Sequence, residues 1–102
     1  MATLVQKVMA ETLGVFVFFM AIFTATKPAW TPFAVALGLL VAVLIFGDVS
    51  GGHFNFTVTL TKLVEGTIGA TEAAGYGLGQ LLGGVLALYV AKNLVAPAVA
   101  SA

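Results

Sequence analysis

The sequence contains no cysteine and no arginine, and its charged residues are limited to four lysines and four carboxylates among 102 residues. Without cysteine, disulfide bonds and thiolate metal sites are excluded. One histidine and four scattered carboxylates are too few for a metal cluster, so we expect neither a metal nor another cofactor. The formal net charge of zero argues against nucleic acid as a partner. A soluble domain needs a polar surface, and this chain has almost no charge with which to build one.

Apolar residues make up 61% of the chain, and the mean hydropathy is +1.13. These values are typical of a membrane protein. We expect three membrane spans, at about residues 8–25, 33–47 and 71–95, the first two near the short end of the roughly 17–25 residues that cross a bilayer. A signal peptide is the alternative for the first, but its apolar run extends to about Thr26, beyond the roughly 7–15 residues usual there. We therefore expect a multi-pass integral membrane protein in contact with the lipid bilayer.

The segment between the second and third expected spans is too polar for a fourth span and too apolar for a soluble loop. Its residues 56–65 can form a helix of about ten residues, roughly 15 Å long, which crosses only half of a hydrocarbon core of about 30 Å. Irregular backbone at that depth is tolerated where protein buries it or water fills a cavity. The sequence thus predicts one all-α unit over residues 1–102, with three transmembrane helices and a re-entrant loop and half-helix at about 48–65.

The loop that precedes this half-helix reads Ser50-Gly51-Gly52-His53-Phe54-Asn55. The first N–H groups of a helix lack partners, and the helix dipole adds positive charge there. The Asn55 side-chain oxygen can cap the half-helix, and its amide N–H₂ can donate to a passing solute. Gly51 and Gly52 can supply a tight turn, after which backbone carbonyls would serve as acceptors. His53 is either a pore-lining donor or a staple that braces the loop.

The segment from Ser50 to Thr59 resembles the first pore loop of the aquaporin and aquaglyceroporin family (major intrinsic proteins), written S-G-x-H-x-N-P-A-V-T. Here Asn55-Phe56-Thr57 stands where the family has Asn-Pro-Ala. Two further stretches resemble the family in the right order. Ala10-Glu11-Thr12-Leu13-Gly14 is similar to its first helix, A-E-x-x-G, and Gly79-Gln80-Leu81-Leu82-Gly83 to its third helix, A-Q-x-x-G.

The resemblance implies roles for individual residues. Glu11 would hold backbone groups of the pore loop, and Gln80 would brace the loop in the same way. From the residues alone, Glu11 can equally pair with Lys7 one helical turn away. The aromatic position early in the family's second helix falls at Val35. The residues expected to line the pore or set its selectivity are Asn55, Phe56, Thr57, Val58, His53, Gly52 and Val35.

Small residues recur at four-residue spacing in the expected spans. Such stripes let helix backbones approach closely in lipid, although glycine is also common in membrane helices generally. The glycines expected to mediate helix packing are Gly75, Gly79, Gly83, Gly38 and Gly14.

Family members carry two inverted halves in one chain, and the resemblance here covers one half. A pore therefore requires a second half in inverted orientation. Lys7 and Lys62 fall on one side of the expected membrane, Lys27 and Lys92 on the other, so the positive-inside rule favours neither orientation. A second copy of this chain is the simplest partner. We expect an antiparallel homodimer, and the family's tetramers of complete pores suggest a tetramer of such dimers.

Two departures from the family pattern bear on function. Val58 lies where the family's second-repeat loop carries the arginine of the narrow filter, which predicts a symmetric, more apolar and less constricted pore. Phe56 replaces the proline that suits a first helical turn, and two Phe56 rings would either stack between the halves or crowd the pore shut.

We thus expect a passive channel for water or small neutral solutes such as glycerol. The alternative is a non-conducting structural subunit of a larger membrane complex, which Phe56 and the missing arginine favour; a piece cut from a longer channel is a third interpretation. An enzyme is not expected, because the sequence has no nucleophile–base set and no phosphate-binding glycine loop.

Overall fold

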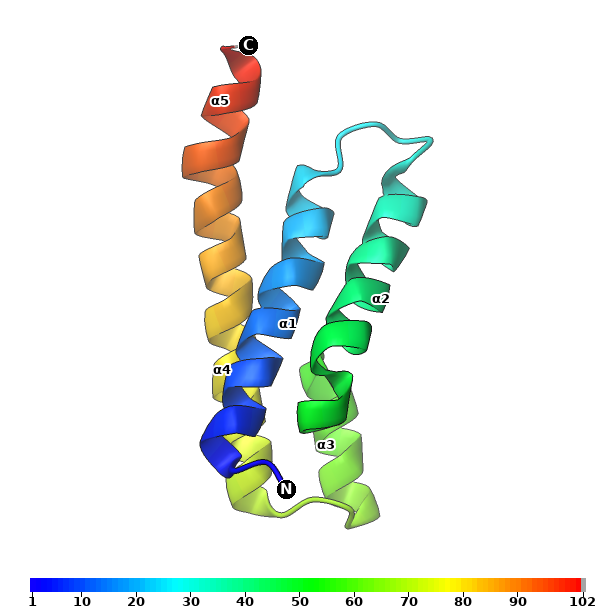
Figure 1. Cartoon of the computed structure of the whole chain (residues 1–102), viewed down its shortest axis with the longest axis vertical. Helices are drawn as coiled ribbons and strands as arrows, with labels where there is room; N and C mark the ends of the chain where they lie inside the picture. The colour runs from blue at the N-terminus through cyan, green and yellow to red at the C-terminus, as the bar shows by residue number, and fades with distance from the viewer. Residues whose placement is uncertain (102) are drawn as a thin grey trace.

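The computed structural model describes residues 1–101, and in this part of the chain the regular secondary structure is entirely helical, without strands (Figure 1). In chain order the elements are α1 (Leu4–Thr24), α2 (Thr31–Ser50), α3 (Phe56–Glu65), α4 (Ala70–Val90), the π-helical turn η1 (Ala91–Val95) and α5 (Ala96–Ala100). Three helices are long and apolar enough to cross a membrane: α1, α2 and the continuous helix Ala70–Ala100. The predicted fold class, three transmembrane helices and one half-helix, is confirmed.

The helix ends are set by local capping rather than by the apolar runs. Helix α1 begins at Leu4, ahead of the expected span, because Thr3 and Gln6 form a reciprocal capping box. Helix α2 continues to Ser50 and ends where Gly51 adopts a left-handed conformation, with φ of 92°. Hydropathy locates the apolar windows, but it does not register these caps, so the expected spans differ from the helices.

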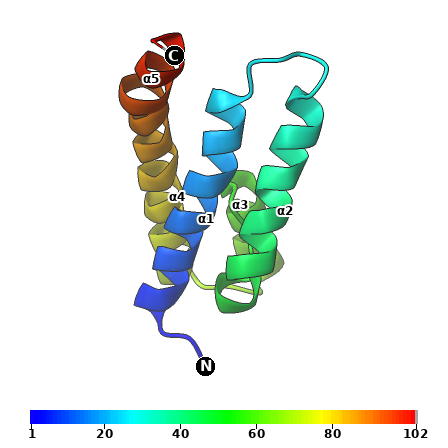
Figure 2. The ribbon, with the colours of Figure 1, turned by 45° about the horizontal axis from the view of Figure 1, so that its top comes forward.

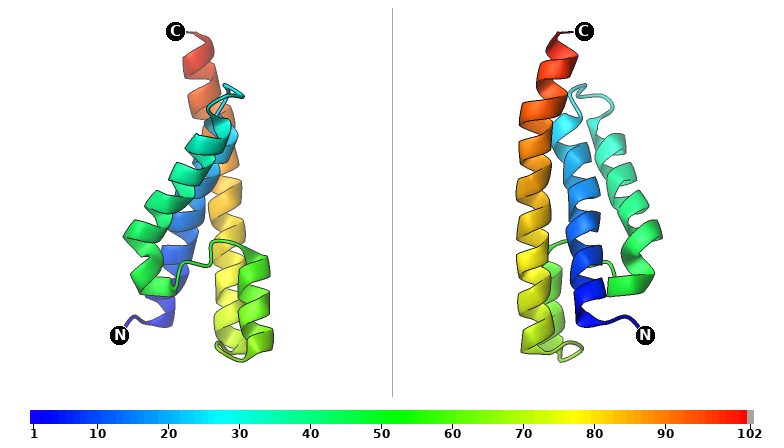
Figure 3. Two further views of the ribbon diagram at one scale, coloured as in Figure 1. Left: turned by 90° about the vertical axis from the view of Figure 1, so that its right-hand side faces the viewer. Right: turned by 60° about the vertical axis from the view of Figure 1, so that its left-hand side comes forward.

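Helix α1 lies between the other two long helices and packs against both (Figure 2). Helix α3 packs against α4 and lies beside its first half only (Figure 3). The loop 51–55 rises from the end of α2 to the start of α3, which then returns toward the same end of the molecule. The chain therefore dips into the bundle and turns back, as a re-entrant segment does. At about 1.5 Å per residue, the ten residues of α3 span about 15 Å, half of the length of α1.

The small residues of the stripe lie at the closest helix contacts. A Cβ atom added at Gly79 would come within 2.7 Å of Thr12 Oγ1, and one added at Gly38 within 2.7 Å of Ala21 Cβ. A methyl group has no room at such distances, so these positions let backbones approach as van der Waals packing in lipid requires. The same holds for Gly75 against Val8 and for Gly83 against the Thr12 carbonyl. Gly14 differs, because the missing side chain there makes room for the Phe54 ring of the loop rather than for another helix.

Candidate functional site

Glu11 is fully buried on α1 and forms the centre of a polar network. One carboxylate oxygen, Oε2, accepts from Ser50 Oγ at 2.6 Å and from the backbone N–H of His53 at 3.1 Å. The other, Oε1, accepts from the Phe54 N–H at 2.8 Å and from Gln80 Nε2 at 2.9 Å. Charge-assisted hydrogen bonds of this kind offset the cost of burying a carboxylate. Through them α1 fixes the loop and α4 at once.

The alternative pairing of Glu11 with Lys7 is not formed. Lys7 Nζ instead contacts Glu72 Oε1 at 2.9 Å, which joins the start of α1 to the start of α4. Glu11 is therefore free of a basic partner in the described structure, and hydrogen-bond donors alone compensate its charge.

Gln80 joins the network from α4 with different partners from those that the sequence suggested. Its Nε2 donates to Glu11 and also, at 2.8 Å, to Thr59 Oγ1 on α3, rather than to the loop backbone. Thr59 is fully buried, and its hydroxyl lies 2.8 Å from His53 Nδ1. His53 thus acts as a staple between the loop and α3, and its ring also lies against Tyr76, with centroids 4.8 Å apart.

Ser50, Thr59 and Tyr76 are members of this network to which sequence reasoning assigned no role. Thr59 follows Asn55 by four residues, so the helical period places it on the face below the cap, and that spacing is a usable signal. Tyr76 donates from its hydroxyl to the Ser50 carbonyl at 2.5 Å. Its ring is 1% exposed, and nothing in the sequence connects it with a residue 26 positions earlier.

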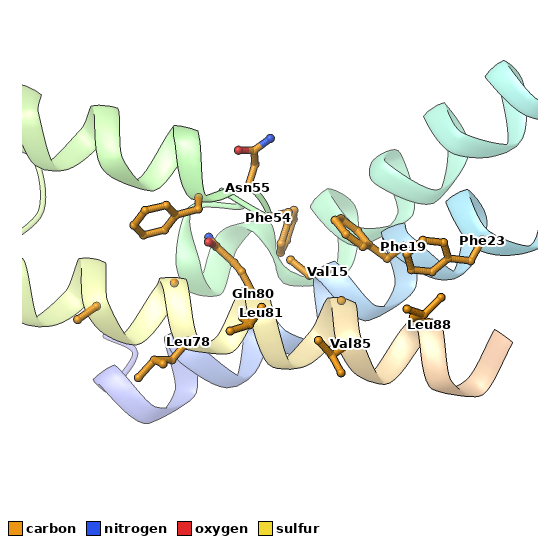
Figure 4. A pocket seen from close by; sticks show the side chains of 14 residues that line it. Val15, Phe19, Phe23, Phe54, Asn55, Leu78, Gln80, Leu81, Val85 and Leu88 are labelled. Atoms are coloured by element: carbon orange, nitrogen blue, oxygen red, sulfur yellow. The ribbon is translucent and has the colours of Figure 1, made fainter. Parts of the chain in front are cut away.

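Asn55 is the N-cap of α3. Its backbone is extended, and its Oδ1 accepts from the Thr57 N–H at 2.7 Å. The side chain is exposed and points away from α4 (Figure 4). Within residues 1–101 its Nδ2 group has no hydrogen-bond acceptor, because the cap uses the oxygen only. An amide donor is therefore presented at the start of the half-helix.

The first turn of α3 leaves further donors unpaired. Among the described residues, the N–H groups of Phe56 and Val58 have no acceptor, while the Thr59 N–H bonds to the Asn55 carbonyl. A proline in place of Phe56 would have no N–H at all. The helix dipole makes this end of α3 partially positive. The region therefore attracts acceptor oxygens and disfavours cations.

A run of left-handed backbone shapes the loop that leads to this end. Gly51, Gly52 and Phe54 have φ of 92°, 65° and 51°. For phenylalanine this region is costly, and such strain persists only where the surroundings hold it. Here the Phe54 ring is 1% exposed and seated on Gly14, while its N–H is held by Glu11. The buried ring and the carboxylate thus fix the conformation that delivers Asn55.

The remaining residues of the expected pore set lie in two separate places, at the start of α3 and in the first turns of α2. Thr57 and Val58 are exposed on α3, and Phe56 is half-exposed beside α4. Val35 lies in the first turns of α2, whose far end leads into the loop. The 15 residues from Val35 to Ser50 span about 22 Å. The loop after Ser50 turns back only part of the way along α2, so the start of α3 does not reach the level of the first turns of α2 (Figure 3).

An apolar groove of about 940 Å³ runs between α1 and α4, beyond the start of α3 (Figure 4). Its volume falls near the upper end of the roughly 300–1,000 Å³ of typical ligand cavities. Aliphatic and aromatic side chains form most of the wall, including Phe19 and Phe23 of α1 and Leu81 and Leu88 of α4. Asn55 and Gln80 are the polar side chains at its edge. The groove is suited to an apolar helix face rather than to a charged ligand.

Comparison with known proteins agrees with this geometry. The chain is 34% identical over 95 residues to Glycerol uptake facilitator protein-like 6 of Lactiplantibacillus plantarum, a match that covers 88% of this chain and 44% of that relative. It is 35% identical over 98 residues to Aquaporin Z of Photorhabdus laumondii, covering 85% of this chain and 42% of that protein. A shorter match, 44% identical over 57 residues, links it to Probable aquaporin TIP1-2 of Oryza sativa, with 56% of this chain and 23% of the relative covered.

The chain thus spans less than half of the length of these relatives. No solved structure matches it. The model of one family, described as Major intrinsic protein, matches residues 1–101, nearly the whole chain. With its three membrane-long helices and re-entrant half-helix, the chain is an integral membrane protein that belongs to the major intrinsic protein family.

Proposed function

We propose that two copies of this chain associate antiparallel and form a passive channel for water or small neutral solutes such as glycerol. The observation that carries the proposal is the start of α3, where Asn55 caps the helix with its oxygen and leaves its amide donor free. Donors at a fixed half-helix end replace part of a solute's hydration, and the dipole opposes cations. Passage past such a site requires no chemical step.

In a single chain the short helix α3 covers only part of the face formed by α1 and α4, which supports a second, inverted copy. Helix α3 covers about half of the length of α4, so a stretch of similar length beside α1 and α4 has no short helix against it. The apolar groove occupies that stretch. An inverted copy would offer its own α3 at this level, with the two helix starts facing one another. It would also bring its Val58 toward the mouth that contains Val35.

The distribution of charge along the chain supports the same arrangement. Lys27 and Lys92 lie at the end where α1 and the third long helix leave the bundle core, and no carboxylate lies there. The opposite end carries Asp48, Glu65 and Glu72 together with Lys7 and Lys62. With the buried Glu11 included, four carboxylates against two lysines give the side chains of that end a charge of −2, and the two lysines give the other end +2. In an antiparallel pair, each basic end lies beside an acidic one.

The proposed roles of the pore residues follow from their positions. The free amide of Asn55 would donate to solute oxygens near the centre of the pore. Val58 and the partner's Val35 would form an apolar, weakly constricted mouth at each end. Thr57 and Gly52 would border the path, and His53 would brace the loop through Thr59 rather than contact solute directly. Complete pores would assemble further as a tetramer of dimers.

Water and glycerol permeability of proteoliposomes tests the proposal. Stopped-flow light scattering should show faster osmotic shrinkage than in protein-free vesicles, at a protein density measured by quantitative blotting. Labelling of Lys7 and Lys27 from each side of the vesicle should find both residues accessible from both sides. Unchanged permeability of correctly inserted protein would contradict conduction, and a single orientation would contradict the inverted homodimer.

A non-conducting structural subunit is the second candidate. Phe56, 52% exposed beside the start of α3, and the absence of arginine from the sequence favour it. This function predicts one fixed orientation, no permeability above background and co-purification with a different membrane protein.

A further inference from the structure

We propose that Gly77 keeps the path past Asn55 open by providing a notch in α4 that holds the Phe56 ring away from it. The inference rests on the proposed channel function and assigns a positioning role within it. Neither residue needs to contact solute. Gly77 acts through the Phe56 ring, whose position against α4 leaves the path past Asn55 open.

The contact between the two residues is direct. A Cβ atom built on Gly77 would lie 2.8 Å from Phe56 Cε1 and 3.0 Å from Cδ1, and the next nearest atom is Cζ of the same ring. Separations below 3.0 Å are essentially never found for real Cβ atoms, so a side chain at position 77 forces the ring or α3 to move. The ring leaves no room for even one methyl group.

Gly77 differs from the other glycines of α4 in what it faces. Gly75, Gly79 and Gly83 are packed against α1, where their missing side chains bring two helices together. At 100° per residue, Gly77 lies on the opposite side of α4 from Gly75 and Gly79. The three atoms nearest to an added Cβ at Gly77 all belong to Phe56. The absence of a side chain at Gly77 therefore serves the Phe56 ring rather than the α1–α4 contact.

Asn55 and Phe56 are neighbours at the start of α3, and their side chains are directed differently. The Asn55 side chain points away from α4 (Figure 4). The Phe56 ring lies against Gly77 on α4. Side chains move between discrete rotamers, so a ring excluded from the notch must turn into the groove or carry the start of α3 with it. The first movement places the ring in the path past Asn55, and the second displaces the Asn55 amide. An open path thus depends on an empty space at Gly77.

Variants at Gly77, Phe56 and Gly84 test this role by stopped-flow water permeability per inserted protein. Gly77→Ala should lower permeability at least about fivefold, because overpacking displaces the ring. Phe56→Ala with Gly77→Ala should have the permeability of Phe56→Ala alone, to within about twofold, because the effects of the two positions are coupled through contact. The matched control is Gly84→Ala on the same helix, whose Cβ would meet the Phe19 ring at 3.2 Å, away from α3. Any loss of permeability in Gly84→Ala should not be recovered by Phe56→Ala, because the atoms nearest to an added Cβ at Gly84 belong to Phe19 and Val15.

Thermal unfolding of the same variants in detergent separates this inference from the channel proposal. The double-mutant cycle should show that Phe56→Ala cancels most of the melting-temperature loss caused by Gly77→Ala, whether or not the protein conducts. Additive losses in a conducting protein would overturn the notch and leave the channel proposal standing. Recovery of Gly84→Ala by Phe56→Ala, or a double variant of Gly77→Ala and Phe56→Ala that is less permeable than Phe56→Ala alone, would likewise overturn the inference. If the melting temperatures show coupling but the unmodified protein does not raise permeability, the packing contact is supported and the channel proposal is contradicted.

Discussion

The network around Glu11 and the start of α3 lie a few residues apart in the loop, but they treat hydrogen bonding in opposite ways. Glu11 has four donors on its two oxygens, and its side chain is fully buried. At the start of α3, the Asn55 amide and two backbone N–H groups have no acceptor within the described residues. Both oxygens of Glu11 are paired, although the neighbouring Gln80 Oε1 is buried without a partner among the described residues, whereas the second region leaves several donors open. The difference teaches that one region fixes the loop, whereas the other presents unpaired donors, as the proposed channel requires.

Disrupting the Glu11 network should have the largest effect on stability. In Glu11→Gln an N–H₂ group replaces one acceptor oxygen and faces donors, so the free energy of unfolding should fall by at least about 2 kcal/mol. Chemical or thermal unfolding in detergent measures it. Glu72→Gln is the matched control, since that carboxylate pairs with Lys7 and keeps partial solvent access; it should cost about 1 kcal/mol or less. Equal losses would contradict a special role for the Glu11 network.

A substitution at the start of α3, where donors are unpaired, should affect transport more than stability. Asn55→Ala removes both the cap and the free amide, so unfolding should become easier by only about 1 kcal/mol. Water permeability should fall by more than that small loss of folded protein accounts for. Asn93→Ala is the control, because Asn93 is an exposed asparagine at the other end of the chain whose Nδ2 bonds the Tyr89 carbonyl. If permeability falls in both variants only in proportion to the loss of folded protein, the Asn55 amide has no part in transport.

The link between the two regions can be tested at Thr59. Thr59→Val keeps the shape and removes the hydroxyl that lies within hydrogen-bond distance of Gln80 Nε2 and His53 Nδ1, so the cost should be about 1–2 kcal/mol. Thr61→Val is the matched control two residues on, since its hydroxyl bonds only the Val58 carbonyl on an exposed face. It should change unfolding by about 0.5 kcal/mol or less. A larger loss of unfolding free energy in Thr61→Val than in Thr59→Val would exclude Thr59 as the connection between the loop and α3.

The smallest effect should come from the charged ends that lie outside both regions. Asp48 is exposed and has no ion-pair partner within the described chain. Asp48→Asn should weaken association of the two copies by about 0.5 kcal/mol, and the difference should vanish in high salt. Sedimentation or energy transfer between labelled copies in detergent measures it. Glu65→Gln is the control, because Glu65 already pairs with Lys62 at 3.3 Å. An effect of Asp48→Asn that persists in high salt would contradict an electrostatic origin.

Much of the fold followed from short-range patterns in the sequence. The apolar runs indicated three long helices, and α3 occupies Phe56–Glu65, the range suggested for a half-helix. The cap by Asn55 depends on a neighbour two residues away, which a sequence pattern can register. Glu11 needed the family resemblance, because its donors lie 39 to 69 residues further along the chain.

What the sequence did not predict depends on packing between distant segments. The hydroxyl of Tyr76 meets the Ser50 carbonyl only because the fold brings the end of α2 within reach of the long Tyr76 side chain on α4. The left-handed backbone of Phe54 is held by Gly14 and Glu11 on another helix. The notch at Gly77 likewise exists only once α3 lies against α4. No local propensity encodes these contacts, so they required coordinates.

Cross-linking between two copies tests the inverted pair most directly, because the chain has no cysteine of its own. Two differently tagged copies would be expressed together, one with Val35→Cys and the other with Val58→Cys. The account predicts an efficient cross-link between Val35→Cys and Val58→Cys, and little between two copies of Val35→Cys, because inversion separates their levels in the membrane. Efficient pairing of Val35→Cys with itself, without the mixed product, would contradict the antiparallel channel.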